Sequence, residues 1–424
     1  MSSGLARWQQ RGSAAPIITF VLPWYGPQIS GGAEYQARRM AEELAARGIA
    51  VEVFSTTAGG LASDWSVPAF PTGADLINGV PVQRFAVRPR NAARFDQLNA
   101  RVLAGELLTL NEEAVFVREI IGSDSLEHVI AAERARRLYI FTPYMFGTSY
   151  WGARHTAGRS YLIPCLHDEP YAKLLLYREL IEHAYALMYY APAEARLARR
   201  LFTIPHERTL VLGGGIDTHM RGDAARFRAA WQLGEQPFML YAGRRDEGKN
   251  TPLLLDYFRR YRQAGGQLML VAIGGPGAPL PADLVASGTA LETGFLDEQA
   301  KFDAYAAADL LCQPSLHESF SIVMMEAWHN QTPVLVHSDC AVTSEFVELS
   351  GGGLHFRTAA EFAACLHWFQ QHPRTAAQMG QAGAAYVQRN FTWAAVLERL
   401  LGFLAATYTR FALPAVLQPR ESTI

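Results

Sequence analysis

The chain has 424 residues, of which 50% are hydrophobic and 18% charged, and its formal net charge at pH 7 is -2. This composition is typical of a globular protein long enough for two domains, and it lacks the basic excess of a nucleic-acid-binding protein. The four cysteines form no Cys-x-x-Cys pair and no Cys/His cluster, which argues against a disulfide scaffold and a zinc site. A reducing cytoplasm is therefore expected.

No apolar run reaches the length of a membrane span. Residues 400–417 come closest, but Thr407, Arg410 and Pro414 interrupt them. Residues 17–22 (IITFVL) end before a proline without a small-residue cleavage site, so we expect a buried strand rather than a signal peptide. Residues 1–15 are expected to form a flexible tail.

After this first strand, a loop ends in Gly31 and Gly32, a helix is predicted over residues 35–47, and a second strand over residues 49–56. The pattern predicts a βαβ unit with a glycine pair at its first turn. The glycines allow the backbone to approach a ligand closely, or they serve a turn that merely requires glycine. The spacing is not Gly-x-Gly-x-x-Gly, so no dinucleotide fingerprint is present.

Four arginines follow a predicted strand at residues 80–88, with no acid until Asp96; they are Arg84, Arg88, Arg90 and Arg94. This stretch is compatible with contact to phosphate or to a membrane surface, and equally with a solvated face. The strand at residues 138–142 leads into an aromatic loop at residues 143–155, which suits sugar stacking, lipid contact or core packing. His167 follows the strand at residues 161–166, at the sheet edge where α/β proteins place ligand groups.

Three glycines at residues 213–215 predict a hinge between two halves of the chain. The second half begins with a strand at residues 238–242, and Arg244 and Lys249 stand in the turn between it and the next helix. Both cations could reach one diphosphate, although a charged surface loop has the same composition.

Residues 312–326 (CQPSLHESFSIVMME) predict a strand, a polar turn and a helix that Ser319 or Ser321 caps. The free N–H groups of such a helix start suit a phosphate. Glu318 stands at the helix mouth and Glu326 eight residues later, roughly 12 Å along if the whole segment were helical. One carboxylate could then serve each end of a nucleotide-sugar, although paired glutamates on a helix are also ordinary surface residues.

Strands alternate with helices throughout, which predicts an α/β fold of two doubly wound, Rossmann-like domains facing each other across a cleft. We expect an N-terminal acceptor-binding domain at residues 16–212 and a C-terminal nucleotide-sugar-binding domain at residues 213–395. Residues 396–424 are expected to return to the N-terminal domain as a helix.

Several short motifs occur in a fixed order: Gly-Gly-Ala-Glu, a strand-tip His, Gly-Arg-x-x-x-x-Lys-Asn, Gly-Gly-Pro-Gly, Gly-Phe-Leu, Pro-Ser-x-x-Glu with a second Glu eight residues later, and Thr-Pro-Val. This ordered set, over residues 17–411, resembles the retaining GT-B glycosyltransferases of family four, also called glycosyl transferases group 1. The resemblance implies the GT-B fold and a last helix that crosses back onto the N-terminal domain.

The resemblance also implies a set of site residues. Arg244 and Lys249 would hold the diphosphate of a nucleotide-sugar donor, together with backbone N–H groups around Phe320, Ser321 and Ile322.

Glu318 would bind the donor sugar hydroxyls, Glu326 the ribose hydroxyls, and His167 would sit over the reacting sugar. Glu318, His167, Arg244 and Lys249 are thus the expected catalytic residues. The remaining ligand contacts would come from the backbone and the base loop, at Gly31, Gly32, Gly274, Gly275 and Phe295.

The implied reaction moves a hexose-type sugar, with retention by a front-face route, to a glycan or lipid-linked glycan, as in polysaccharide or O-antigen biosynthesis. No Asp-x-Asp occurs, so neither a metal nor another cofactor is expected. A cytoplasmic place at or near the inner membrane face, with peripheral membrane contact, fits such acceptors.

The chain departs from the family where Ser319 and Ser321 replace frequent glycines and where Asn330-Gln331-Thr332 precedes Pro333. Activity and donor choice are therefore open, and two alternatives stand beside a transferase: an inactive GT-B protein that binds a glycan or partner, and a same-fold epimerase or phosphorylase.

Overall fold

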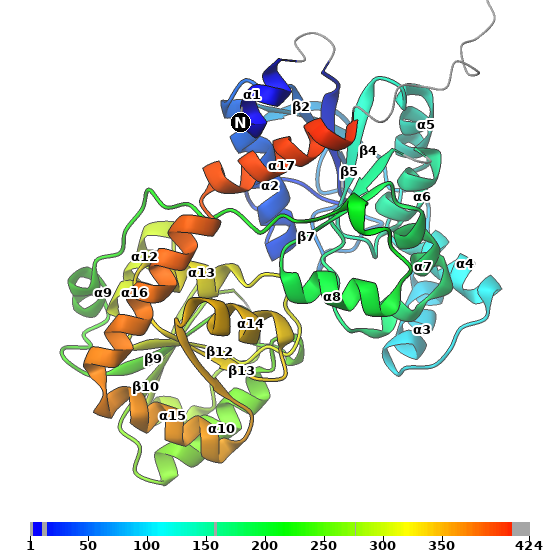
Figure 1. The fold of residues 1–424 in the computed structure, drawn as a ribbon. Helices are drawn as coiled ribbons and strands as arrows, with labels where there is room; N and C mark the ends of the chain where they lie inside the picture. Colours follow the sequence, from blue (N-terminus) through cyan, green and yellow to red (C-terminus); the bar gives the residue numbers. More distant parts are fainter. Residues whose placement is uncertain (1–2, 11–14, 157–158, 276, 409–424) are drawn as a thin grey trace, which may run out of the picture.

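The computed structural model describes residues 3–10, 15–156, 159–275 and 277–408, which fold into two α/β domains (Figure 1). The first contains an eight-stranded sheet in the order β3-β4-β2-β1-β5-β6-β7-β8. Only β3 runs antiparallel to its neighbour. The strands are β1 Ile17–Val21, β2 Val51–Thr56, β3 Gly73–Ile77, β4 Val80–Phe85, β5 Arg137–Phe141, β6 Ser160–Leu162, β7 Ala186–Tyr189 and β8 Thr209–Val211.

The continuous apolar runs of the sequence become the central strands of this sheet, because both faces of a parallel sheet are covered by helices. In β1, Ile18 pairs with Val51 on one side and Leu138 on the other, and its side chain is fully buried. The helices of the domain are α2 Gly32–Ala46, α3 Ala92–Leu103, α4 Leu110–Glu119, α5 Asp124–Glu133, α6 Gly147–His155, α7 Leu175–His183 and α8 Pro192–Leu201.

The second domain has a six-stranded parallel sheet in the order β11-β10-β9-β12-β13-β14. Its strands are β9 Phe238–Ala242, β10 Met269–Ile273, β11 Ala290–Gly294, β12 Leu310–Gln313, β13 Val334–His337 and β14 Gly353–Phe356. The helices around it are α9 Ala224–Ala230, α10 Thr251–Gln263, α11 Ala282–Ala286, α12 Glu298–Ala307, α13 Ile322–His329, α14 Ala341–Ser350, α15 Ala359–Gln371 and α16 Pro373–Asn390.

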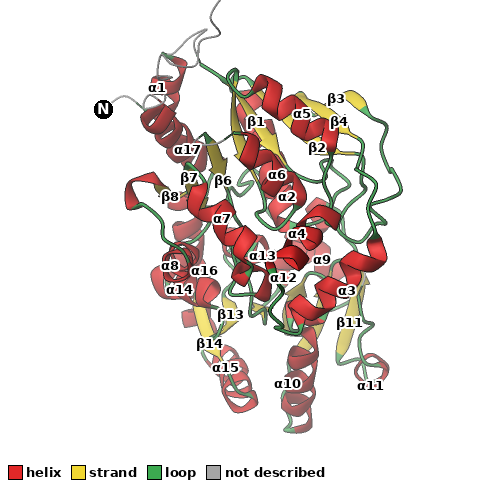
Figure 2. Cartoon of the chain, turned by 90° about the vertical axis from the view of Figure 1, so that its right-hand side faces the viewer, coloured by secondary structure: helices red, strands yellow, loops and turns green. Residues whose placement is uncertain are grey.

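The last helix, α17 Trp393–Tyr408, leaves the second domain and packs on the first (Figures 1 and 2). The expected flexible tail at residues 1–15 is a wrong prediction for its described part, because residues 4–9 form helix α1 Gly4–Gln9 on α17. Trp8 is 2% exposed, and its ring lies 6.4 Å from that of Tyr408. A single tryptophan in an otherwise polar segment does not predict that the segment packs on another helix.

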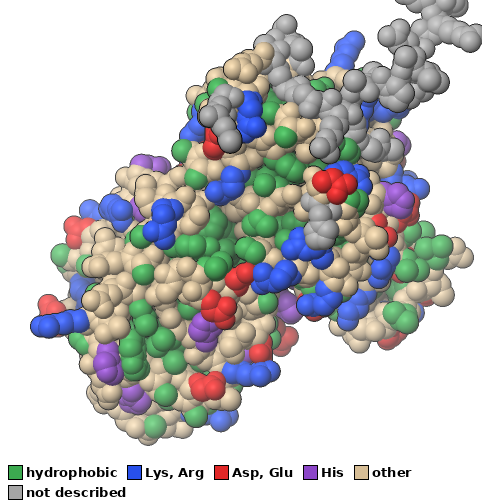
Figure 3. Space-filling model, in the orientation of Figure 1, with side chains coloured by type: hydrophobic (Ala, Val, Ile, Leu, Met, Phe, Trp, Pro, Cys, Tyr) green, Lys and Arg blue, Asp and Glu red, His purple; other side chains and the backbone are tan. Residues whose placement is uncertain are grey.

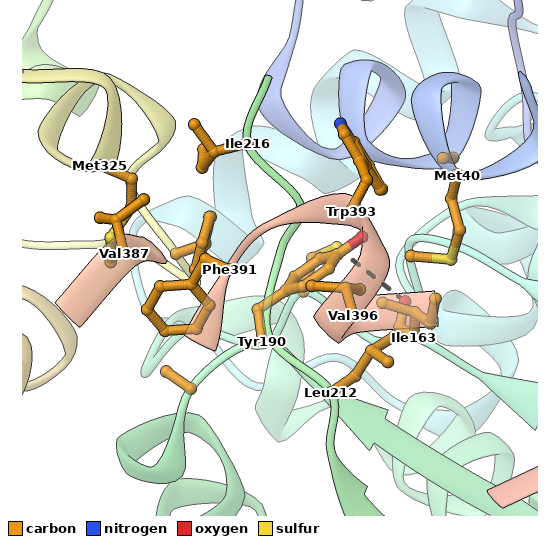
Figure 4. Close-up of a cluster of buried hydrophobic side chains, with 14 of the residues drawn as sticks. Met40, Ile163, Tyr190, Leu212, Ile216, Met325, Val387, Phe391, Trp393 and Val396 are labelled. Carbon is orange, nitrogen blue, oxygen red and sulfur yellow. Dashed lines mark hydrogen bonds between the residues drawn. The ribbon is translucent and has the colours of Figure 1, made fainter. Parts of the chain in front are cut away.

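The chain crosses between the domains twice, and the two crossings lie side by side. The linker after β8 is hydrogen bonded to the turn that precedes α17, from Ile216 N to Phe391 O at 2.7 Å. Figure 4 shows aromatic rings of α17 and the preceding turn gathered with aliphatic side chains of the linker. A Cβ placed on Gly215 would lie 2.2 Å from the ring of Trp393, so this glycine permits close packing rather than free bending.

A buried polar cluster fastens helix α2 to the same linker. The side-chain amide of Gln36 donates to Gly215 O and accepts from Gly215 N, both at 2.9 Å. The carboxylate of Asp217 accepts from Tyr35 Oη at 2.9 Å, from Arg39 Nη2 at 2.6 Å and from Trp393 Nε1 at 2.9 Å. The helix that starts at the glycine pair is therefore held in place by the hinge.

Among the described residues, no helix is both long and apolar enough to cross a membrane. On the face drawn in Figure 3, basic side chains gather over α8, beside acidic side chains of the second domain. One such pair joins the domains directly, from Arg196 Nη1 to Glu345 Oε1 at 2.7 Å.

Candidate active site

The turn between β12 and α13 carries the first predicted glutamate. Gln313, the last residue of β12, donates through Nε2 to Glu318 Oε1 at 2.7 Å and to Ser321 Oγ at 3.2 Å. Ser321 is the N-cap residue of α13 at φ 69°, but its hydroxyl makes no capping hydrogen bond. The expectation that a serine hydroxyl caps this helix is therefore wrong, and the first N–H groups of α13 lack a side-chain acceptor there.

The turn between β9 and α10 brings Lys249 to the same place. Asp246 Oδ1 accepts from Lys249 N at 2.9 Å, and Asn250, at φ 54°, donates through Nδ2 to Pro314 O at 3.0 Å. These contacts hold the two turns together. Lys249 Nζ then lies 2.7 Å from Glu318 Oε1, so two predicted site residues form a partly buried ion pair.

The two neighbouring arginines of this turn differ sharply in environment. Arg245 is 4% exposed, donates through Nε to Ala278 O at 2.8 Å and pairs with Glu292. Arg244 has a side chain that is 52% exposed, and its closest acid is Asp246, at 3.4 Å from Nε. Arg244 therefore has the more accessible side chain of the pair, and its contact with a diphosphate stays a prediction.

The second predicted glutamate lies one turn inside α13. Because α13 begins at Ile322, Glu326 is about 6 Å from the helix start along the axis, and the 12 Å estimate for an all-helical segment does not apply. Glu326 is 3% exposed. Its carboxylate accepts from Lys301 Nζ at 2.7 Å and from Tyr305 Oη at 3.0 Å.

Helix α2 of the first domain begins opposite α13. A Cβ placed on Gly32 would lie 3.8 Å from Ile322 Cδ1, which shows that the two helix N-termini are neighbours. Each N-terminus carries free N–H groups and a partial positive charge, so an anion is favoured between them. Gly31 lies at φ 136°, a backbone conformation that residues with a Cβ rarely adopt, so this position favours glycine.

Glu34 is itself part of this junction. Its Oε1 accepts from Trp24 Nε1 at 2.8 Å. Burial raises the pKa of Glu34, and the charge of Arg244, from the other domain, acts in the opposite direction. An acid of the first domain and a cation of the second therefore share one electrostatic environment.

His167 lies across from the β12–α13 turn. Its ring centroid is 6.1 Å from that of His317, and its Nδ1 is 3.8 Å from Glu169 Oε2. Burial lowers the pKa of His167, but the nearby carboxylate of Glu169 and the charge of Glu318 outweigh this effect and raise the pKa above its usual value. His167 is thus close enough to Glu318, the predicted sugar-binding acid, for the charge of Glu318 to affect its pKa.

Two other predicted residues have different surroundings. The Phe320 side chain is 3% exposed and packs on Phe391 in the hinge, 5.1 Å between centroids, so only its backbone faces the helix mouth. Phe295 is 83% exposed. Gly274, at φ 126°, packs its backbone on Gly243, where a Cβ would lie 2.6 Å from the carbonyl oxygen.

Two open interpretations of the first half are decided by burial. Arg84 and Arg88 are 2% and 3% exposed, so the basic stretch is neither a solvated face nor a surface patch at those positions. Arg84 stacks on Phe70, 4.1 Å from the ring centroid. In the aromatic loop, Tyr144 and Phe146 are 0% and 4% exposed, so these rings pack in the core.

Four residues that the sequence analysis did not single out support the site; they are Gln313, Lys301, Tyr305 and Glu194. Glu194, in the first turn of α8, accepts from Leu166 N at 2.7 Å and Tyr190 N at 2.6 Å, which fixes the segment that carries His167. Lys301 and Tyr305 stand four residues apart on α12 and so share a helix face. This spacing is the sequence feature that could have indicated that the two side chains act together.

Comparison with known proteins identifies the family. The family model for the glycosyl transferase 4-like domain matches residues 31–215, and the model for glycosyl transferases group 1 matches residues 223–386. The chain is a group 1 glycosyltransferase with the GT-B fold. The resemblance stated from the sequence motifs is confirmed at this level.

Curated relatives of this glycosyltransferase match over nearly their whole length. The D-inositol 3-phosphate glycosyltransferase of Kribbella flavida is 24% identical over 93% of this chain and 96% of its own. That of Nocardia farcinica is 26% identical over 93% of this chain and 89% of its own.

Solved structures share the fold at lower identity. Sucrose-phosphate synthase from Thermosynechococcus elongatus superposes with a TM-score of 0.70 at 18% identity, over 94% of this chain and 100% of that chain. HepE from Anabaena, in complex with UDP-glucose, gives a TM-score of 0.64 at 17% identity over 94% and 100%. Each of these matches covers 94% of this chain, which is more than either domain alone.

Proposed function

We propose that this glycosyltransferase moves a hexose-type sugar, with retention of anomeric configuration and without a metal ion, from a nucleotide diphosphate-sugar to a glycan or lipid-linked glycan. The observation that carries the proposal is the pairing of Lys249 with Glu318 at 2.7 Å, beside the opposed N-termini of α2 and α13. A cation, an acid and two sets of free N–H groups are what a diphosphate-linked sugar requires.

The reaction follows from charge. Breaking the bond between the sugar and the diphosphate leaves negative charge on the leaving oxygen and positive charge on the sugar ring. Lys249, Arg244 and the helix starts would stabilise the leaving diphosphate, a preorganised electrostatic effect. Glu318 would exchange its bond with Lys249 for sugar hydroxyls, and His167 would border the reacting face. The leaving oxygen would take the acceptor proton, so no enzymic nucleophile is needed.

The choice of a nucleotide-sugar donor is supported by the charged groups of the site and by the similarity of the fold to HepE. HepE from Anabaena has been solved in complex with UDP and in complex with UDP-glucose. UDP-sugars are therefore the first donors to test. For the acceptor, the curated relatives are named for D-inositol 3-phosphate, so that compound belongs in the acceptor panel beside glycans.

The test combines binding and stereochemistry. Thermal unfolding is measured with UDP, GDP and ADP and their glucose and mannose conjugates, each with and without EDTA. We expect one nucleotide series to raise Tm equally in both conditions, because binding to the native state stabilises it. NMR of the glycoside product should then show the anomeric configuration of the donor.

Each part of the proposal can fail separately. Inversion at the anomeric carbon would overturn the retaining mechanism, and loss of activity with EDTA would overturn metal independence. A chain that binds no nucleotide would instead be a glycan- or partner-binding GT-B protein. Donor epimerisation without an acceptor would identify an epimerase.

A further inference from the structure

Two consecutive arginines after β9 contact different parts of the second domain. Arg244 has a side chain that is 52% exposed, in the same turn as Lys249. Arg245 is 4% exposed and extends toward the ends of β10 and β11, where it contacts Ala278 and Glu292. The turn after β9 therefore joins the predicted diphosphate site to the two neighbouring strand ends.

The guanidinium of Arg245 contacts both of those strand ends. Its Nε donates to Ala278 O, in the turn after β10, at 2.8 Å. Its Nη2 pairs with the carboxylate of Glu292, a residue of β11. The other oxygen of that carboxylate accepts from Leu280 N at 3.4 Å. One ion pair thus holds two residues of the turn after β10, Ala278 and Leu280, against β11.

The backbone of Arg245 contacts the same turn. Its carbonyl oxygen accepts from Ala278 N at 2.8 Å. A Cβ placed on Gly277 would lie 2.5 Å from that oxygen, so a glycine is needed for the two backbones to approach this closely. Gly274 N donates to Gly294 O at 2.9 Å, which joins the ends of β10 and β11. The ends of three neighbouring strands are therefore held together as one unit.

This unit lies beside the candidate active site. In the strand order β11-β10-β9-β12, the Lys249–Glu318 pair stands at β9 and β12, and β10 and β11 continue the same carboxyl edge of the sheet. Phe295, directly after β11, is 83% exposed and offers an aromatic surface on which a base can stack. We therefore expect the nucleoside end of the donor at the ends of β10 and β11.

We propose that Arg245 is a positioning residue that fixes the turn after β10 against β11. The turn then forms a preformed platform that receives the base of the nucleotide donor and distinguishes one base from another. Arg245 acts through the turn and does not touch the donor. This inference rests on the proposed function, in which a nucleotide diphosphate-sugar binds at this edge.

A fixed turn matters because the polar groups that recognise a base have to be held in one arrangement. A loose turn would adapt to several bases, and it would have to be ordered during binding, which costs affinity. UDP, GDP and ADP share the ribose and the diphosphate, so a difference in their affinities reports on the base alone. Arg245 should therefore control the preference among bases and leave the transfer step unchanged.

The experiment measures the affinities of UDP, GDP and ADP by calorimetry for the wild type and for Arg245→Met. The wild type should bind one of the three about tenfold or more tightly than the others, because mismatched polar groups stay unpaired. In Arg245→Met the preferred nucleotide should bind about 5- to 30-fold less tightly, and the preference should shrink to about threefold or less.

Kinetics separate positioning from chemistry. With the sugar donor of the preferred nucleotide, KM of Arg245→Met should rise by about the same 5- to 30-fold, while kcat at saturating donor stays within about twofold. The reason is that Lys249 and Glu318 are unchanged in this variant. A loss of kcat without a change in KM would contradict a role at the base.

Folding of the variant can be controlled. Arg245→Met leaves Glu292 with a side chain that is 34% exposed and so reaches water. Should the single variant not fold, Arg245→Met/Glu292→Leu replaces the whole ion pair by apolar side chains, which folded proteins often tolerate, and it should show the same loss of preference. Arg260→Met removes an exposed ion pair with Asp256 on α10 and is the matched control with unchanged preference.

Three results would overturn the inference. The first is a folded Arg245→Met variant that keeps the wild-type preference and affinities, which leaves the proposed function intact. The second is equal weakening of all three nucleotides, which would make the role of Arg245 structural only. The third is a wild type that binds UDP, GDP and ADP equally. Absence of binding by all three would overturn the proposed function and this assignment together.

Discussion

The two domains contribute to their junction in different ways. The second domain supplies charged side chains that already pair with one another, Lys249 with Glu318 and Lys301 with Glu326, each at 2.7 Å. The first domain supplies backbone at Gly31 and Gly32, together with the side chains of Glu34 and His167. A substitution in the second domain should therefore change chemistry, whereas one at the hinge should change stability first.

The largest effect is expected at the Lys249–Glu318 pair. Lys249→Ala and Glu318→Gln should each lower kcat/KM by about 10²–10³-fold, because each removes a preorganised charge from the reacting centre. Sugar transfer measured under initial-rate conditions checks this, with Tm confirming that the variants are folded.

The double variant sharpens the result. Since the two groups contact each other, the loss in the double variant should be smaller than the product of the single losses. Glu247→Gln, an exposed residue of the same turn, is the matched control and should keep normal activity. Near-normal turnover in both single variants would contradict a role for the Lys249–Glu318 pair in the active site.

A substitution in the hinge should act on stability. In Gly215→Ala the added methyl meets the Trp393 ring, where a Cβ would lie 2.2 Å away. Overpacking of this kind costs about 1–3 kcal/mol, which lowers Tm by roughly 2–10 °C. Differential scanning calorimetry measures the change.

Gly275→Ala serves as the control for stability, because a Cβ there meets no atom within 4 Å. If Gly215→Ala unfolds at the wild-type temperature, the linker is looser than its packing indicates. Substitutions in the second domain and in the hinge would then no longer differ in whether they change activity or stability.

A smaller effect is expected from the pH dependence of Glu194. Burial raises its pKa to about 7 from the usual 4.5. Because the folded-state value is raised, this carboxyl contributes stability that is fully present below about pH 4.5 and is lost as the pH rises through about 7. The wild-type free energy of unfolding should therefore fall over this window.

Glu194→Gln removes this titration, so its unfolding free energy should change less between pH 4.5 and 7 than that of the wild type. Urea unfolding at several pH values measures both slopes. His167 has a raised pKa that gives a slope of the same sign, and the charge of Glu194 contributes to that shift, so Glu194→Gln also loses part of the His167 slope. Identical slopes would show that Glu194 titrates normally.

The fold was largely predictable from sequence because its determinants are local. Apolar runs such as residues 17–22 became buried parallel strands, and the ordered motifs indicated the family. Lys249 and Glu318 were predictable as partners because both stand in turns at the same edge of one sheet. The antiparallel edge strand β3 was not predicted, since three of its five residues are exposed and its sequence lacks an apolar run.

The supporting residues could not be predicted for a different reason. Lys301, Tyr305 and Gln313 act through contacts that form only when α12, β12 and α13 pack together. The buried arginines illustrate the reverse error: Arg84 and Arg88 look like surface residues, yet aromatic rings and acids enclose them. A charged residue in a sequence indicates that burial would cost free energy. It does not indicate which residues of the folded protein would surround and pair with that charge.

The hydrogen bond between Ile216 and Phe391 has a mechanical consequence. Both covalent connections between the domains pass through that one seam, so sliding one domain past the other would strain two chain segments at once. Rotation about the seam strains these two connections less than sliding does, and it would change the distance between the glycine pair and the mouth of α13. Any opening or closing of the junction is therefore expected to occur by rotation about this packed seam rather than by sliding.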